Sequence, residues 1–359
     1  MLMSFIFLLV TIKIKRGEKK MKKVLSFILM LTMTFCILTG CEGKGSKSSE
    51  EPKVNEKQVE SVQNDDHYPV TIKTHNYSKD IVEVTFDKAP ERVICYGLNS
   101  VENMIALGLE DRIVLSMVRA EDVLPKYQDG LKKIPNVQKD FITKEKALEL
   151  QPDYILGWYS SFSDKKLGDV DFWHERNINT YMANNSGIGD QNLENEYEDI
   201  LNLGKVFNVE EKAEEIVNQM KAKVKEGQEL VKEREKVDLV ILEDEKNVFR
   251  IYGENTIGGD IAMQVGANLV AKDKNVKLSA EDLIKLNPKM IFGVHFGPNS
   301  TSLNDKNCLD VFKNNPALGN IDAVKDGEIY PIDLSLVYSP GVRILESLDF
   351  FLEHLYPEK

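Results

Sequence analysis

The sequence predicts an α/β fold in which two lobes are joined by a helical segment. One observation is a repeated unit: TKEKALELQPDYILGW at residues 143–158 returns as SAEDLIKLNPKMIFGV at residues 279–294. Another is the stretch 193–236, which is rich in Glu, Lys, Leu and Val and contains no proline. The third is the stretch 92–117, whose strand, helix, strand pattern is typical of a βαβ unit in a parallel sheet.

Length and charge narrow the class of protein. A chain of 359 residues with 42% hydrophobic residues exceeds one comfortable core, so two domains are expected. The formal charge is -12, and residues 1–40 hold seven Lys and Arg against one Glu, so the rest of the chain is more acidic still. Because phosphate binding requires a basic face, nucleic acid is not an expected partner.

The N-terminal region predicts export and anchoring. From Met21, two lysines precede an apolar run that ends at Leu38-Thr39-Gly40-Cys41. A basic start, a short apolar core and small residues at its end are typical of a secretory signal rather than a membrane span. The last four residues resemble the lipobox of bacterial lipoproteins, which implies cleavage before Cys41 and a lipid on its sulfur. We therefore expect a signal peptide at 1–40, with Met21 as the possible true start.

A polar segment follows the lipobox. It consists of Lys, Glu, Ser and Gln with almost no large apolar residue, so residues 41–67 are expected to form a disordered, lipid-anchored tether. Of the remaining cysteines, Cys95 and Cys308 fall in different expected lobes. Two separate thiols are therefore expected rather than a disulfide, although a disulfide stays possible outside the cell.

The N-terminal lobe is expected to span residues 68–192. Alternating residues after Tyr68 predict a β-hairpin. Apolar runs predict strands at 92–96, 113–117, 154–158 and 179–182, and helices are expected at 100–107, from Lys144, and at 167–176.

The connector and the C-terminal lobe follow. Residues 193–236 predict a shorter helix and then one long helix that joins the lobes. The C-terminal lobe, 237–359, is expected to contain strands at 238–242, 248–252, 290–294 and 328–331 and helices at 257–265, 308–314 and 343–355. Arg343 stands at the start of the last, amphipathic helix.

The repeat places a glutamate at the same position in each lobe. Thr143 and Ser279 suit the N-cap of a short helix, and Glu145 and Glu281 fall in its first turn, where the helix dipole favours a carboxylate. Each helix then runs antiparallel to its strand, so both glutamates should lie near the carboxyl ends of the strands, where open parallel sheets bind ligands. Local helix stabilisation is the alternative reading of both residues.

At this point the sequence resembles a known family. The lipobox, the tether, RVICYGLNSVENMIALGL, the two repeats and the joining helix are similar to substrate-binding proteins of the siderophore, haem and cobalamin type, which serve ABC importers. The resemblance covers roughly residues 70–357. It implies two Rossmann-like lobes, a ligand cleft between them, and docking of Glu145 and Glu281 onto arginines of the permease dimer, which works with its ATPase.

The ligand that this resemblance implies is a metal chelate, for which we expect a ferric siderophore. Haem, cobalamin, or a role as an extracellular ligand sensor or adhesin are the alternatives. We expect a monomer anchored to the outer face of the cell membrane, without a bound cofactor.

Most candidate ligand residues stand at or just after strand carboxyl ends, and Tyr338 and Arg343 stand near the last helix. Aromatic rings there can stack on a ligand, and arginines can bind anionic oxygens. For each of them, packing within a lobe or solvent exposure is the alternative. Tyr159 and His295 occupy equivalent repeat positions and are expected on opposite walls. The candidates are Tyr96, Asn99, Arg119, Trp158, Tyr159, Tyr252, Glu254, His295, Phe296, Tyr338 and Arg343.

Two further classes of site are not expected. Of five histidines only His295 stands convincingly at a strand end, so a chelate or macrocycle is favoured over a bare metal ion. The chain also contains no G-x-S-x-G, G-x-G-x-x-G, P-loop or H-E-x-x-H motif, so an enzyme is not expected.

Overall fold

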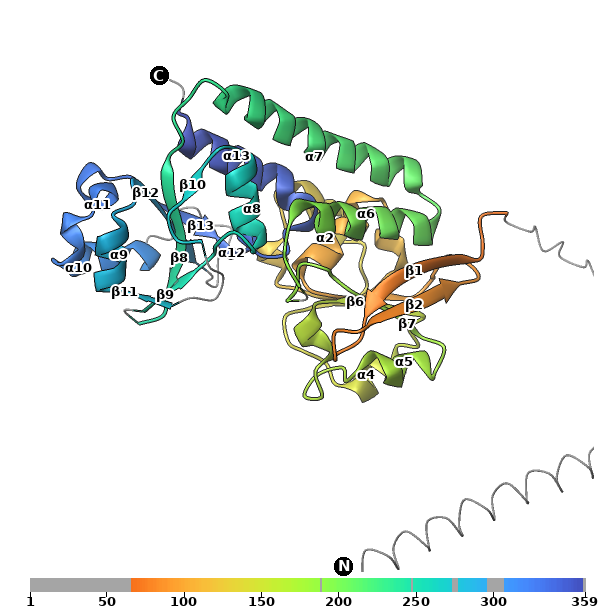
Figure 1. Ribbon diagram of the computed structural model, residues 1–359. Helices are drawn as coiled ribbons and strands as arrows, with labels where there is room; N and C mark the ends of the chain where they lie inside the picture. Colours follow the sequence, from red (N-terminus) through yellow and green to blue (C-terminus); the bar gives the residue numbers. More distant parts are fainter. Residues whose placement is uncertain (1–65, 188, 247, 273–276, 296–306, 358–359) are drawn as a thin grey trace, which may run out of the picture. The chain divides into compact units, whose positions relative to one another are not determined.

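The computed structural model describes residues 66–187, 189–246, 248–272, 277–295 and 307–357 (Figure 1). The predicted signal peptide, Cys41 and nearly all of the tether lie outside these residues. Within the described part of the chain, no helix has both the length and the apolar character to cross a membrane.

The first sheet is entirely parallel, and its strand order places the candidate site. The order is β5-β4-β3-β6-β7. The chain starts in the middle with β3, moves outward to β5, and then returns to add β6 and β7 on the other side. The order thus reverses between β3 and β6, and such a switch point opens a crevice beyond the strand ends. The strands are β3 (Val93–Tyr96), β4 (Ile113–Met117), β5 (Val137–Gln138), β6 (Tyr154–Gly157) and β7 (Asn179–Met182).

Short helices connect these strands, and a hairpin precedes them. The hairpin pairs β1 (Val70–His75) with β2 (Ile81–Phe86), as predicted, and packs against β7 and helix α6. The helices are α2 (Leu98–Ala106), α3 (Gln128–Leu131), α4 (Lys144–Glu149) and α5 (Val170–His174). Helix α5 is shorter than predicted because Gly168 adopts a φ of 74° and Asp169 caps the helix by accepting a hydrogen bond from the Val170 N–H.

Two helices form the predicted connector. A shorter helix, α6 (Leu193–Phe207), ends at Asn208 in the left-handed conformation, and the long helix α7 (Glu210–Val231) follows. The buried face of α7 includes Val217, Met220 and Val224, at helical spacing. This helix packs along α13 (Ile344–Leu355) (Figure 1).

The second sheet is mixed. Its order is β11-β9-β8-β12-β13, and β10 pairs with β8. Strands β8, β10, β12 and β13 are parallel, whereas β9 and β11 form an antiparallel edge. The strands are β8 (Asp238–Asp244), β9 (Val248–Ile251), β10 (Asn268–Leu269), β11 (Lys277–Ser279), β12 (Met290–His295) and β13 (Ile329–Asp333). The other helices are α8 (Ile257–Gln264), α9 (Ala280–Leu286), α10 (Asp310–Asn314), α11 (Asp322–Asp326) and α12 (Leu334–Val337).

One hydrophobic core cluster is shared by both lobes. It contains Val93 and Met104 from the first lobe, Val217 from the connector, and Leu239 and Phe292 from the second lobe. Each lobe also has a separate cluster on the other side of its sheet. The lobes are therefore joined by packed side chains as well as by the connector.

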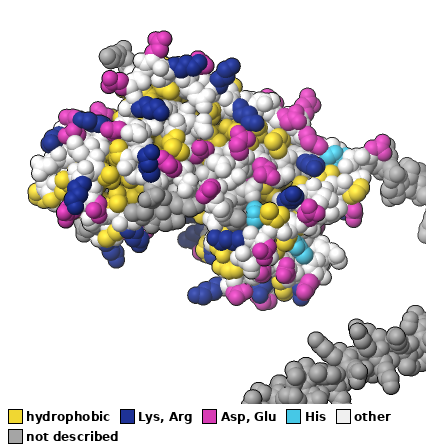
Figure 2. All heavy atoms as spheres, in the orientation of Figure 1, with side chains coloured by type: hydrophobic (Ala, Val, Ile, Leu, Met, Phe, Trp, Pro, Cys, Tyr) yellow, Lys and Arg dark blue, Asp and Glu magenta, His cyan; other side chains and the backbone are white. Residues whose placement is uncertain are grey.

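The described surface is mixed in charge, and the two described cysteines are separate thiols. On the face shown in Figure 2, acidic and basic side chains are interspersed over both lobes. Cys95 is buried and Cys308 is half-buried, and both are free thiols, as expected.

Candidate ligand-binding cleft

The reversal point of the first sheet carries a hydrogen-bonded pair of predicted site residues. Asn99 follows β3 and Trp158 follows β6, and the indole Nε1–H of Trp158 donates to Oδ1 of Asn99 at 2.7 Å. Gly97 stands two residues before Asn99 and has a φ of 131°. A Cβ at this position would lie 3.3 Å from the Trp158 indole. Glycine is thus required for the close approach of the Trp158 ring to the backbone.

A pocket of about 190 Å³ opens at this point and is lined from both lobes. The rings of Trp158 and Tyr338, one from each lobe, meet edge to face with centroids 5.6 Å apart. The first lobe contributes Leu98, Asn99, Arg119, Asp122 and Trp158, and the second contributes Asp333, Leu334, Ser335, Tyr338, Ser339, Pro340 and Arg343. Of the predicted ligand residues, the structure therefore brings Asn99, Arg119, Trp158, Tyr338 and Arg343 to one pocket.

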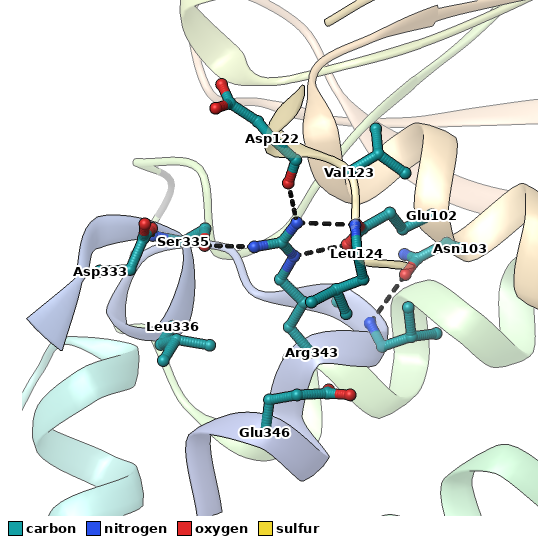
Figure 3. A network of polar contacts seen from close by, with 12 residues as sticks. Glu102, Asn103, Asp122, Val123, Leu124, Asp333, Ser335, Leu336, Arg343 and Glu346 are labelled. Carbon is teal, nitrogen blue, oxygen red and sulfur yellow. Dashed lines mark hydrogen bonds and ion pairs between the residues drawn. The ribbon is translucent and has the colours of Figure 1, made fainter. Parts of the chain in front are cut away.

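The two arginines of this pocket differ in their surroundings. Arg119 pairs with Asp122 at 2.6 Å and keeps 31% of its side chain exposed. Arg343 is buried, and its guanidinium donates from Nε and Nη2 to the two carboxylate oxygens of Glu102 at 2.6 and 2.7 Å (Figure 3). Nη1 donates to Oγ of Ser335, and Nη2 also donates to the carbonyl oxygen of Asp122.

These contacts suggest a structural role for Arg343, whose ligand role stays a prediction. Its donors are directed to protein groups, and its partners Glu102 and Asp122 belong to the first lobe while Arg343 belongs to the second. A bidentate arginine–carboxylate pair fixes geometry as well as charge. The observed contacts support a residue that fixes one lobe on the other rather than one that clamps a ligand.

Two backbone contacts complete this junction between the lobes. The N–H of Val342 donates to Oδ1 of Asn103 at 2.9 Å, and the N–H of Gly341 donates to Oε2 of Glu196 at 2.8 Å. Gly341 has a φ of 56°, and a Cβ there would lie 2.4 Å from Oδ1 of Asn103, so a larger residue cannot replace it without a shift.

A second cavity of about 310 Å³ shares Tyr338 with the cleft pocket. Tyr252, a predicted ligand residue, lines it and donates from its hydroxyl to Glu243 at 3.0 Å. Two cations, Lys79 and Arg250, also line this cavity, one from each lobe.

The remaining predicted ligand residues do not line these two cavities. Tyr96 is buried and stacks on Phe141. Tyr159 stacks on Tyr77 with centroids 4.6 Å apart, and Nζ of Lys79 lies over its ring. Glu254 pairs with Lys272. Phe296 lies outside the described residues.

His295 is buried within the second lobe, 5% exposed at the end of β12. Neither of its ring nitrogens has a hydrogen-bond partner among the described residues. None of the pockets described here is lined by both His295 and Tyr159, and their place on opposite walls stays a prediction. The described part of the chain also contains no group of three His, Cys, Asp or Glu residues that could hold a metal ion.

Sequence reasoning missed Asp333, Ser335, Glu102 and Asp122. Asp333 is the last residue of β13, and so it stands at a strand carboxyl end like most of the predicted candidates. It was missed because the predicted strand ends at residue 331. The pairing of Glu102 with Arg343 joins residues 241 positions apart, and neither residue carries a local signal for it.

The two repeat glutamates lie as predicted in the first turns of α4 and α9. Thr143 and Ser279 are the N-caps, and each side chain accepts a hydrogen bond from the N–H three residues on. Glu145 is exposed, and a hydrogen bond from Thr143 lowers its pKa. Glu281 is 77% exposed at its side chain and pairs with Lys285 at 2.9 Å.

A buried acidic pair beside the junction makes the stability depend on pH. Burial raises the pKa of Glu196 from its ordinary value near 4.5 to about 7, and burial and the charge of Glu196 raise the pKa of Asp199. A raised folded-state pKa means that the native protein binds more protons than the unfolded chain. The stabilising contribution of Glu196 is thus complete below pH 4.5 and is lost as the pH rises to about 7.

We therefore expect the original protein to lose this contribution when the pH rises from 5 to 8, whereas Glu196→Gln, which cannot ionise at this position, should not. The difference in free energy of unfolding between the two proteins should shift in favour of the variant. The shift should be on the order of 2–3 kcal/mol, because each pKa unit corresponds to about 1.4 kcal/mol. Urea unfolding at a series of pH values measures it. A difference between the two proteins that is constant over this range would contradict the assignment.

Two lobes that enclose a pocket lined from both sides define a two-lobed binding protein. The chain belongs to the periplasmic binding protein family, since residues 93–335 match that family.

Individual relatives agree with this assignment. The chain is 26% identical over 358 residues to the uncharacterised ABC transporter substrate-binding lipoprotein YvrC of Bacillus subtilis, covering 94% of this chain and 99% of that protein. A periplasmic binding protein of Veillonella parvula is 30% identical with a TM-score of 0.71, covering 81% of this chain and 92% of that one. The fold is also shared with the Fe3+-hydroxamate transport system protein of Saccharomonospora viridis, at 21% identity and a TM-score of 0.65, covering 81% of this chain and 100% of that one.

Proposed function

We propose that this protein is the lipid-anchored, extracytoplasmic solute-binding component of an ABC importer, and that it captures a metal chelate, best matched by a ferric siderophore. The observation that carries the proposal is the pocket at the switch point, where Trp158 and Tyr338 face each other across the two lobes. Membership of the periplasmic binding protein family and the printed description of YvrC support the transport role.

The charges of the neighbouring cavity favour a ligand with anionic oxygens. Its described lining contains Lys79 and Arg250 and no acidic side chain, whereas the cleft pocket holds two arginines beside two aspartates. Aromatic rings bind the flat, apolar part of such a ligand, while the cations bind its oxygens.

The volume of the described cleft pocket suggests a rearrangement on binding. A volume of about 190 Å³ is below the roughly 300–1,000 Å³ of pockets that hold drug-sized ligands. The neighbouring cavity of about 310 Å³ shares only Tyr338 with it. We propose that the Tyr338 side chain moves and joins the two cavities when the ligand binds.

The direct test is a fluorescence titration. The chain has two tryptophans, and Trp173 is fully buried while Trp158 lines the cleft. We expect quenching by ferric siderophores, and the titration should include haem and cobalamin as separate arms. In Trp158→Phe, most of the quenching should disappear because Trp173 is remote from solvent. An absence of quenching by all three ligand classes would overturn the ligand assignment.

The proposal also assigns a docking role to the two repeat glutamates. Glu145 and Glu281 are exposed on separate lobes and stand in the first turns of matching helices. Each can form a bidentate pair with an arginine of one permease subunit, and charges at the rim of an interface mainly set orientation and association rate. The lipid at Cys41 would hold a monomer at the membrane near that permease.

A further inference from the structure

A large groove outside the cleft has no assigned function. Its volume is about 820 Å³, and it lies between one face of α13, strand β13 and the first-lobe segment 121–128. We call it the α13 groove. Asp333, Ser335 and Arg343 line both the groove and the cleft pocket, so these three residues form the wall between them. At this size it can hold a drug-sized molecule.

The floor of the α13 groove is apolar and aromatic. The ring of His354 stacks on Phe350 with centroids 4.1 Å apart and meets Tyr330 at 4.4 Å. Val123, Leu124 and Leu336 add aliphatic surface. Figure 3 shows Val123, Leu124 and Leu336 around the buried Arg343.

The polar residues of the groove are mainly carboxylates. Glu346, Asp349 and Glu353 project from one face of α13, and Glu121 and Asp333 add two more acidic groups. The one arginine of the lining, Arg343, is neutralised by its buried pair with Glu102. Lys126 pairs with Glu346 and Lys223 pairs with Asp349, while Glu353 is exposed and forms no ion pair with the described residues.

One buried carboxylate in this wall has an unpartnered oxygen. Asp333 is 4% exposed, and its Oδ1 accepts the N–H of Ser335 at 2.8 Å, but its Oδ2 has no hydrogen-bond partner among the described residues. Oε2 of Glu346 is buried and unpartnered as well. An unpaired buried acceptor is costly, and a cationic donor would relieve that cost. Burial raises the pKa of Asp333, while hydrogen bonds from Ser335 and the charges of His295 and Arg343 lower it.

From this combination we propose that the α13 groove is a second small-molecule site, for an organic ammonium ion with an aromatic or branched aliphatic body. The body lies on Tyr330, Phe350 and Leu336, where an ammonium near an aromatic face also gains cation–π attraction. The ammonium donates to Asp333 and Glu346 at the inner end, and Glu353 attracts it at the rim. This site goes beyond the proposed transport function and does not depend on it.

Isothermal titration calorimetry with protonated phenethylamine tests the proposal, with phenethyl alcohol as the neutral analogue of similar shape. We expect the amine to bind at least about tenfold more tightly than the alcohol, because a hydrogen bond between charged groups is worth roughly 1.5–3 kcal/mol. Equal affinity of the two probes, or no binding of the amine, would overturn the proposal.

Variants locate the site. Asp333→Asn should weaken amine binding about tenfold or more. The asparagine oxygen can still accept the Ser335 N–H, and binding of the alcohol should not change. Glu353→Lys, at an exposed position that does not threaten folding, should weaken amine binding several-fold by charge repulsion. The matched control Glu83→Lys, at an exposed position of β2, and the cleft variant Trp158→Phe should bind the amine like the original protein. If Trp158→Phe loses amine binding, or if Glu353→Lys binds the amine as tightly as the original protein, the amine binds outside the α13 groove.

Discussion

Replacing Arg343 with alanine is expected to lower the free energy of unfolding by about 3–5 kcal/mol, since it leaves a buried carboxylate without its partner. Glu102 is fully buried, and in the variant it would keep only the N–H of Leu124, which donates to Oε1 at 2.8 Å. Urea or thermal unfolding measures the loss.

The control for this prediction is Arg119→Ala. Arg119 also pairs with a carboxylate, but 31% of its side chain is exposed against 3% for Arg343, so its replacement should cost less stability. A second control replaces Glu102 and Arg343 together by methionine, which should restore much of the stability because no buried charge remains. If Arg343→Ala costs no more than Arg119→Ala, the junction does not depend on this ion pair.

The double variant Glu145→Ala and Glu281→Ala is expected to bind its ligand normally and to lose uptake through the importer. Both side chains are exposed, and the helix caps Thr143 and Ser279 remain, so folding should be nearly unchanged. Neither glutamate lines the cleft pocket. Uptake of radiolabelled iron chelate by cells, together with the fluorescence titration on purified protein, separates the two effects.

The matched control removes two exposed acids that are not in the first turns. Glu149 lies at the end of α4, and Asp326 lies at the end of α11 in the other lobe. Their combined replacement by alanine changes the net charge equally and should leave uptake intact. Unchanged transport by the Glu145 and Glu281 variant would refute the docking role.

Much of the fold could be predicted because apolar runs and breaks are local signals. The strands at 113–117 and 179–182 were predicted with their observed bounds, and the order of a shorter and a longer helix in the connector is confirmed. Strands β5, β10 and β11 were missed because two or three residues carry no periodicity. They form where a neighbouring strand supplies hydrogen bonds.

The two copies of the repeat also share a backbone conformation in the turn between helix and strand, which was not predicted. Gln151 and Asn287 occupy equivalent positions before the two prolines, and both have a positive φ, 48° and 43°. Asparagine tolerates this conformation well, whereas glutamine adopts it less readily. The second copy is preceded by β11, and in the first copy no strand precedes the helix at the equivalent position.

The candidate site was predictable only in part. Strand ends gave Asn99, Arg119 and Trp158 for the cleft pocket, because strand direction fixes where the ends of a parallel sheet lie. The partners of Arg343 could not be predicted, since side-chain pairing across the lobes depends on their packing. For this reason a conspicuous arginine was read as a ligand residue, and the structure shows it in an ion pair.

The hydrophobic cluster shared by the two lobes has a consequence for how the protein unfolds. Residues such as Met104, Val217 and Phe292 belong to one continuous interior, so neither lobe can lose its packing without exposing apolar surface of the other. The described lobes should therefore melt together in one cooperative transition. A solute that binds in the cleft would then protect the whole of this interior, and thermal stabilisation would report its binding even at residues far from it.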